Sequence, residues 1–275
     1  MKIYNDPSER SSRDLDFLIK EDQLDASIQN LESLGYELLT NFSTPKQKEA
    51  ILRYYHHMEL YNSKEDTLVE LHWKLTSLKN FSFNLNEVWS EKYSISISNF
   101  DVRVLSDNQL ITYLSLHGTL HCFFRLQWLT DLFHLFSRIP ADEINRFYIQ
   151  QKKIHADQFI AITLTLLNEL FGLHVPQKII SDLNKRSKKI VEISQKRIIE
   201  NTALTRKVSR PKTTWRNHQI QYLSGGIKGL KMSIFSRNVR PKNWQIFSFP
   251  DSVFFLNHLF SRVIWFISKL KRAEQ

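Results

Sequence analysis

Cysteine, glycine and long apolar runs are all scarce in this chain of 275 residues. Cys122 is the single cysteine, and the first of only six glycines is Gly35. One cysteine excludes an intramolecular disulfide framework and favours a reducing compartment. No run of eighteen or more apolar residues is free of charge, as a membrane-spanning helix requires, and the first residues lack the apolar core of a secretory signal. We therefore expect a cytoplasmic protein.

Acidic residues are rare in the last part of the chain. Residues 178–275 contain 21 Lys and Arg against 5 Asp and Glu, whereas residues 1–177 contain 17 against 23. The formal net charge of +10 therefore hides a basic C-terminal part. Such a part suits a polyanion or an anionic membrane surface, in the latter case peripherally at the inner face. An ordinary solvated basic face is the alternative.

The overall balance of residues is that of a globular protein. The chain is 42% hydrophobic and 24% charged, which indicates a packed core rather than disorder. Alternating and helical patterns predict a first strand from Asp14, a helix that Gly35 ends, and then three strands. These strands are expected at 36–42, 53–61 and 67–75, with a break at 43–46 and a further strand pair at 93–98 and 101–105.

Helical spacing dominates from Asp107 onward, where Asp107 is a suitable N-cap. Helices are expected from 107, over 123–136, 141–152 and 156–173, after Pro176 and through 184–205. The predicted fold class is α+β, with a small mixed β-sheet followed by a larger, mostly α-helical domain. The expected divisions are an α/β domain at 1–105, a helical domain at 106–206, and a basic loop with an aromatic amphipathic C-terminal helix at 207–275.

The first strand carries two carboxylates. Asp14 and Asp16 are two residues apart, so they point to the same face of a strand. Side by side they repel each other, and a divalent cation such as Mg2+ would neutralise them through oxygen ligands. A solvated strand end beside Arg13 is the alternative.

A third acid lies on the strand expected at 67–75. Glu70 has apolar neighbours on both sides, and alternation places it with His72 on one face. A buried, unpaired carboxylate would be costly. Glu70 therefore either shares a metal with Asp14 and Asp16 or pairs with a lysine on the sheet face.

The helical part contains a second polar motif. His117 and His121 are four residues apart. The glutamate that directly follows the first histidine in His-Glu-x-x-His zinc sites is absent, and the sequence suggests no third ligand, which disfavours a zinc site. We expect substrate contact or packing instead. Near the C-terminus, the apolar segment 253–267 is followed by basic residues, and it either lies in a membrane interface or caps the helical domain.

Together these motifs resemble the nucleotidyltransferase fold of the DNA polymerase β-like superfamily, and in more detail an uncharacterised bacterial nucleotidyltransferase family. The resemblance covers most of the chain, including its aromatic tail at 244–250. The matching residues are Arg10, Arg13, Asp14, Asp16, Glu70, His72 and Trp73, followed by His117, His121, Arg125, Trp128 and Asp131.

The resemblance implies transfer of a nucleoside monophosphate from a nucleoside triphosphate, such as ATP, to an acceptor. Asp14, Asp16 and Glu70 would be the catalytic residues and would hold Mg2+, with two ions expected and Mn2+ as the alternative. Glu70 would also help to activate the acceptor hydroxyl. The implied substrate-binding residues are Arg10, Arg13, His72, His121, Arg125 and Asp131.

One part of the family pattern has no match. The family places a strand, a Lys-Gly turn that cradles the triphosphate and a helix before the paired aspartates. Only thirteen residues precede Asp14, and none is glycine. We therefore expect a chain truncated at its N-terminus relative to the family. Two interpretations stay open: an active nucleotidyltransferase, or a non-catalytic binding or scaffold protein that keeps the fold and contacts a membrane or polyanion through its basic part.

Overall fold

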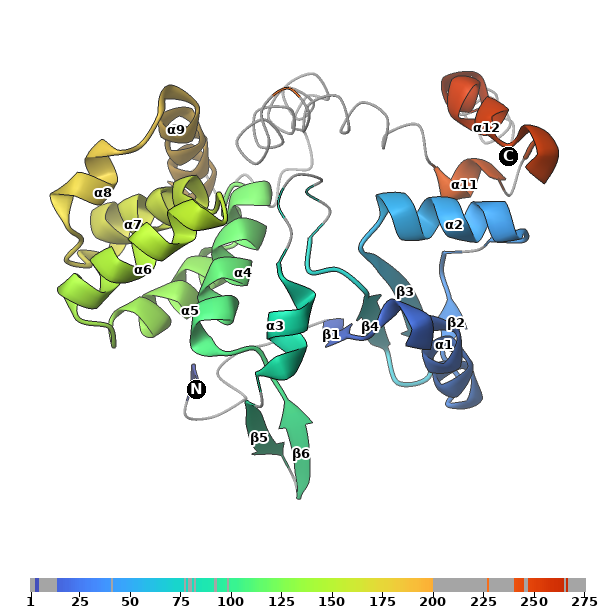
Figure 1. The fold of residues 1–275 in the computed structure, drawn as a ribbon, viewed down its shortest axis with the longest axis horizontal. Helices are drawn as coiled ribbons and strands as arrows, with labels where there is room; N and C mark the ends of the chain where they lie inside the picture. The colour runs from blue at the N-terminus through green and yellow to red at the C-terminus, as the bar shows by residue number, and fades with distance from the viewer. Residues whose placement is uncertain are drawn as a thin grey trace. The chain divides into compact units, whose positions relative to one another are not determined.

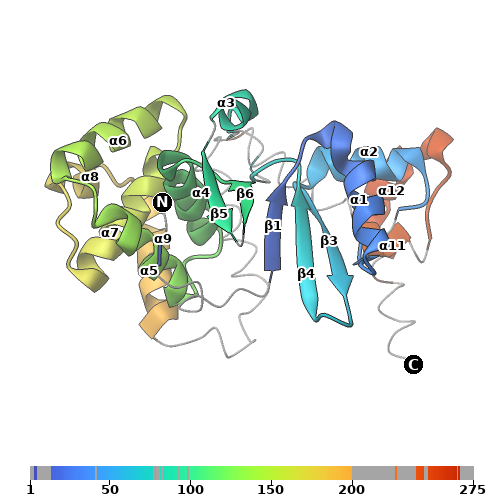
Figure 2. The same cartoon turned by 90° about the horizontal axis from the view of Figure 1, so that it is seen from below.

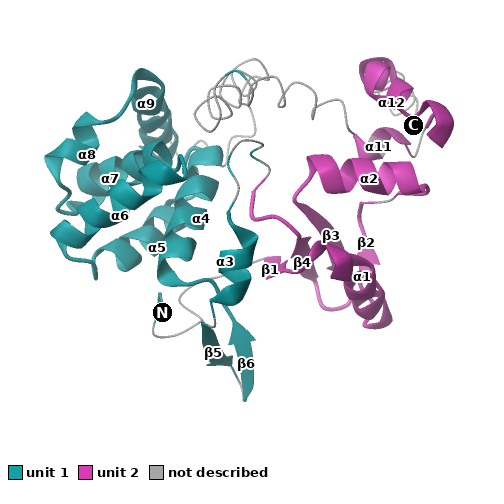
Figure 3. Cartoon of the chain, in the orientation of Figure 1, with its two compact units in different colours: residues 1–6, 78–230 teal, residues 7–77, 231–275 magenta. Residues whose placement is uncertain are grey.

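The computed structural model contains two compact units, which are described separately (Figure 3). One comprises residues 7–77 and 231–275, and the other residues 1–6 and 78–230. Residues 78–105, expected in the first domain, thus group with the helices, and the C-terminal segment groups with the sheet. The residues that the structure describes are 3–4, 14–40, 42–76, 78, 81, 83–91, 93–97, 99–199, 227, 240–244, 247–264 and 266.

The first unit is built on a four-stranded mixed sheet (Figures 1 and 2). Its strand order is β1-β4-β3-β2, where β1 and β4 are parallel and the other neighbours antiparallel. The small mixed sheet followed by a mostly helical region confirms the expected fold class. The strands are β1 (Asp14–Leu18), β2 (Glu37–Leu38), β3 (His57–Asn62) and β4 (Thr67–His72).

Alternation along the central strands gives this sheet one apolar face. Met58 and Leu60 of β3 and Val69 and Leu71 of β4 are buried, because side chains two residues apart share a face. Helices cover these residues and form one core with them. The covering elements are α1 (Leu24–Ser33), which the short η2 (Glu21–Gln23) precedes, α2 (Pro45–Tyr54) and α11 (Pro241–Trp244).

Helix α2 overturns one expectation. The break at 43–46 and the strand over 53–61 were expected, but Pro45 begins a helix that continues to Tyr54. The side chain of Thr44 accepts a hydrogen bond from the backbone N–H of Gln47, and proline at the first helical position is compatible with helix geometry because its missing N–H would be unpaired there anyway. The strand expected at 36–42 is likewise limited to Glu37–Leu38.

The described part of the C-terminal segment is hydrogen-bonded to the beginning of α2. Thr44 Oγ1 donates to Asp251 Oδ1 at 2.6 Å, and Gln47 Nε2 donates to Ser248 Oγ at 3.1 Å. Trp244 and Phe254 extend the apolar core of the sheet unit. This segment includes η3 (Asp251–Val253) and α12 (Phe255–Leu259).

The second unit is mostly helical. Its central helix is α7 (Asp157–Phe171), in which every residue from Phe159 to Leu167 is buried. Around it pack α4 (Asp107–Leu120), α5 (Leu126–Phe136), α6 (Ala141–Lys153), α8 (Gln177–Ser181) and α9 (Lys185–Ile199), preceded by α3 (Leu85–Ser90) and the hairpin of β5 (Ser94–Ile97) and β6 (Phe100–Arg103). Helix α4 is capped by Ser106, through a capping box with Gln109, rather than by Asp107.

The corner between α4 and α5 is tightly packed. Cys122 and Phe123 both have positive φ angles, so α5 begins at Leu126 rather than at Phe123. A β-carbon on Gly118 would lie 2.1 Å from the ring of Phe123. The absence of a side chain at Gly118 is therefore what allows this ring to be buried against α4.

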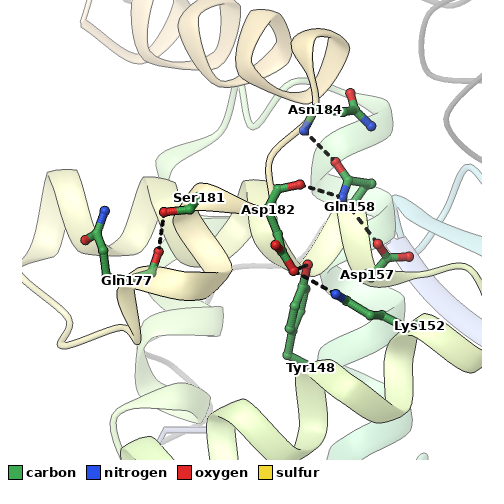
Figure 4. A network of polar contacts seen from close by, with 8 residues as sticks. All are labelled: Tyr148, Lys152, Asp157, Gln158, Gln177, Ser181, Asp182 and Asn184. Carbon is green, nitrogen blue, oxygen red and sulfur yellow. Dashed lines mark hydrogen bonds and ion pairs between the residues drawn. The ribbon is translucent and has the colours of Figure 1, made fainter.

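A polar network joins four helices of the second unit (Figure 4). Gln158 of α7 donates to the backbone carbonyl of Asp182 and accepts from the backbone N–H of Asn184. The carboxylate of Asp182 accepts from Tyr148 at 3.2 Å and from Lys152 at 2.7 Å. These bonds connect α6 and α7 to the link between α8 and α9. Among the described residues, no helix is both long enough and apolar enough to cross a bilayer.

Candidate functional site

Three strands bring a polar cluster together on the sheet face opposite the apolar core. Asp16 of β1 lies directly opposite Glu70 of β4, and Glu70 lies directly opposite Glu59 of β3. In the next row His72 of β4 lies opposite His57 of β3. The period-two pattern of each strand thus sends all five side chains to one face.

The ring of His72 lies between two of these carboxylates. Its Nε2 is 3.0 Å from Glu70 Oε2 and 3.5 Å from Asp16 Oδ1. Burial lowers the pKa of His72, but the two carboxylates outweigh burial and raise it to about 9. His72 is therefore protonated at neutral pH and balances part of the negative charge of Asp16 and Glu70.

The carboxylates differ in exposure. The side chain of Asp16 is 49% exposed, whereas that of Glu70 is 19% exposed. The hydrogen bond from His72 lowers the pKa of Glu70, although burial opposes this shift. Glu70 is therefore ionised at neutral pH and has a fixed partner on its own strand.

Two further histidines adjoin the cluster. His57 Nδ1 is 3.1 Å from His56 Nε2, and the ring centroid of His57 is 4.9 Å from that of His72. Burial lowers the pKa of His57, against the charge of Glu70. His56, His57 and Glu59 were missed as site residues by sequence reasoning. Alternation along the expected strand already places His57 and Glu59 on one face, but their position beside Glu70 comes from the pairing of β3 with β4, which the sequence pattern does not contain.

The donor set fits a divalent cation. Asp16, Glu70 and His72 each offer a ligand atom, and these atoms lie within 4.8 Å of one another. Asp14 begins β1, two residues before Asp16 and on the same face, and it lies opposite Leu68 of β4. The carboxylate oxygens of Asp14, Asp16 and Glu70 are the hard ligands that Mg2+ prefers.

The helical motif forms a separate aromatic cluster within the second unit. The rings of His117 and His121 lie 4.9 and 5.4 Å from that of Trp128. The guanidinium of Arg125 lies 5.6 Å from the Trp128 ring centroid, within cation–π range. Asp131, by contrast, is completely buried and accepts a 2.6 Å hydrogen bond from Tyr4.

Of the expected substrate-binding residues, the structure brings His72 to the acidic cluster, and it brings His121 and Arg125 to the ring of Trp128 in the second unit. Asp131 lies in the interior of that unit. Arg10 and Arg13 lie outside the described residues. The assigned roles of these residues stay predictions.

A comparison with protein families shows to which family the chain belongs. A family model described as an uncharacterised nucleotidyltransferase matches residues 1–172, which include β1, β4 and both polar motifs. The chain belongs to this family. The match confirms the resemblance to the uncharacterised nucleotidyltransferase family. Neither the search of curated proteins nor the search of solved structures finds a match.

Proposed function

We propose that this member of the nucleotidyltransferase family is a Mg2+-dependent enzyme that transfers a nucleoside monophosphate from a nucleoside triphosphate to an acceptor. The observation that carries the proposal is the pairing of Asp16 with Glu70 across β1 and β4, beside Asp14 on the same face. Family membership supports the general reaction.

Each residue has a role in this proposal. Asp14 and Asp16 would hold Mg2+ against the triphosphate, and Glu70 would hold the ion that serves the acceptor hydroxyl. The bound metal would supply charge neutralisation of the triphosphate and activation of the attacking hydroxyl. His72 fixes the Glu70 carboxylate by the 3.0 Å hydrogen bond, which preorganises that carboxylate before substrate binds.

The decisive experiment is Asp16→Asn, which removes one charge and keeps the shape of the side chain. Transfer from α-32P-labelled nucleoside triphosphates would be followed for the full chain, in Mg2+ and in Mn2+, by self-labelling and with candidate acceptors. We expect a loss of at least a hundredfold for Asp16→Asn and none for Asp22→Asn, an exposed acid just after β1. Equal activity of Asp16→Asn and the parent chain would refute the proposal.

A second candidate function is that of a binding or scaffold protein that contacts anionic membranes. Its support is a group of exposed apolar side chains near the C-terminus, next to basic residues in the sequence. The exposed residues are Phe255, Leu259, Phe260, Val263 and Phe266. Apolar insertion together with basic contacts is how interfacial helices bind anionic lipid.

Sedimentation with vesicles tests this candidate. We expect binding to vesicles that contain phosphatidylserine, weaker binding to neutral phosphatidylcholine vesicles, and loss of binding for Phe255→Ser/Leu259→Ser. Leu34→Ser, at an exposed leucine that follows α1, is the matched control. Binding that is unchanged in the double variant would exclude this segment as the membrane contact.

A further inference from the structure

A group of nitrogen ligands extends the carboxylate site toward β3. His56, His57 and His72 each offer a ring nitrogen, and these nitrogens lie within 4.8 Å of one another. His57, Glu59 and Glu70 form a second group that satisfies the same limit. The two groups share His57, which makes this residue the centre of the arrangement.

The distances around His57 are those between ligands of one ion. His57 Nε2 is 3.7 Å from Glu59 Oε1 and 3.8 Å from Glu70 Oε2. Hydrogen bonds of this type are about 2.7–3.2 Å long, so these separations are too long for direct bonds. Ligand atoms around a tetrahedral ion with bonds of about 2.1 Å are about 3.4 Å apart. The two distances from His57 exceed this separation by only a few tenths of an ångström, and the ligand atoms of Glu59 and Glu70 lie within 4.8 Å of each other.

The neighbouring histidines hold these ligands in place. The contact between His57 Nδ1 and His56 Nε2, at 3.1 Å, directs the other nitrogen of His57 toward Glu59 and Glu70. The contact between His72 and Glu70 orients the carboxylate. Hydrogen bonds of this kind, from ligands to groups behind them, are typical of metal centres.

This position shares Glu70 with the carboxylates that Mg2+ would use, and it differs from them by the imidazole of His57 and by Glu59 of β3. Imidazole nitrogen suits zinc and its neighbours in the first transition series, whereas Mg2+ prefers oxygen alone. One nitrogen with two carboxylate oxygens leaves a fourth position for water, as in catalytic zinc sites.

We propose that His57, Glu59 and Glu70 bind a divalent transition-metal ion, represented by Zn2+, at a position on β3 and β4 that is separate from Asp14. His56 is then a positioning residue that fixes the ring of His57. The proposal concerns metal binding alone and does not rest on nucleotidyl transfer.

Calorimetric titration of the metal-stripped full chain with Zn2+ tests the proposal. We expect one strong site in the parent chain and binding at least tenfold weaker in Glu59→Gln and in His57→Gln. Glu65→Gln, in the exposed turn between β3 and β4, removes the same charge as Glu59→Gln and should leave the affinity unchanged. Circular dichroism and thermal unfolding of each variant would verify that it is folded.

Co2+ provides a spectroscopic measurement of the same site. Bound Co2+ should give visible absorption with the intensity of four-coordinate geometry, and this absorption should be lost in His57→Gln. A folded Glu59→Gln or His57→Gln chain that binds Zn2+ as tightly as the parent would overturn the proposal, as would a parent chain that binds no Zn2+.

A further variant separates this inference from the proposed function. Asp14→Asn should abolish transfer from nucleoside triphosphates and leave Zn2+ affinity within twofold of the parent. Loss of transfer with retained Zn2+ binding would support both proposals. Absence of transfer in the parent chain would refute only the enzyme, and absence of Zn2+ binding would refute only the second metal.

Discussion

Asp16 and Glu70 occupy directly opposed positions on parallel strands, and the ring nitrogen of His72 lies 3.0 Å from one carboxylate and 3.5 Å from the other. Two carboxylates that both lie this close to one ring nitrogen repel each other, and a positive charge between them relieves the repulsion. His72 supplies it in the absence of a metal, because its pKa is raised to about 9.

Protein stability should therefore depend on pH through His72. Since its pKa is higher in the folded state than its usual value of 6.5, its contribution is complete below about pH 6.5 and is lost as the pH rises through about 9. We expect His72→Gln to lower the free energy of unfolding by on the order of 2 kcal/mol at pH 6 and by much less at pH 10. Urea titrations at both pH values measure the difference. A loss that is equal at both would contradict this role.

Metal should compete with this proton. If Asp16 and Glu70 bind Mg2+, the added positive charge beside His72 should lower its pKa. In NMR titrations of the ring protons of His72, we expect the titration midpoint of the parent chain to fall when Mg2+ is added. In Asp16→Asn, whose midpoint is already lower because one carboxylate is gone, we expect Mg2+ to cause no further change. A titration midpoint of His72 that is the same with and without Mg2+ in the parent chain would count against a cation at these carboxylates.

The corner of α4 and α5 should tolerate no side chain at Gly118. An added β-carbon would overlap the buried ring of Phe123, so Gly118→Ala should lower the free energy of unfolding by about 2–3 kcal/mol. Gly172→Ala is a matched comparison because only its positive φ opposes a side chain and no atom lies within 4 Å. Its cost should be about 1 kcal/mol.

A double-mutant cycle identifies the cause at Gly118. In a Phe123→Leu background the ring is absent, so Gly118→Ala should lose most of its cost. Thermal unfolding of the four chains gives the coupling energy. Additive effects would show that the backbone of Gly118, rather than the ring of Phe123, requires glycine.

The network in Figure 4 should depend on one amide. The side-chain amide of Gln158 takes part in four hydrogen bonds, with Asp157, Asp182, Asn184 and Ser187. Gln158→Ala should lower the free energy of unfolding by about 2 kcal/mol, because it leaves partly buried polar groups without their partner. Gln177→Ala should cost less than about 0.5 kcal/mol, since Gln177 takes part through its backbone carbonyl. Urea unfolding compares the two, and equal losses would contradict the argument.

Part of the candidate site could be predicted from the sequence because it depends only on alternation. The period-two pattern places Asp14 with Asp16 and Glu70 with His72, and the structure has both pairs on the sheet face opposite the apolar core. The pairing of β1 with β4, by contrast, does not follow from alternation. Strand order depends on contacts between segments more than fifty residues apart, which no local pattern contains.

The errors came from local signals that were given too much weight. Pro45 was interpreted as a break, although Thr44 before it is a good N-cap and proline is favoured at the first helical position. Missing α2 extended the next strand backwards to Arg53. His57 and Glu59 were missed for a different reason, because their contact with Glu70 depends on the pairing of β3 with β4.

The tight corner at Gly118 also gives the protein an internal probe of local opening. Cys122, the single cysteine of the chain, is completely buried in that corner. A thiol reagent in solution can therefore modify it only while the corner is open, so the labelling rate reports the free energy of that opening. Because no other thiol reacts, the measurement needs neither an introduced cysteine nor the removal of a native one.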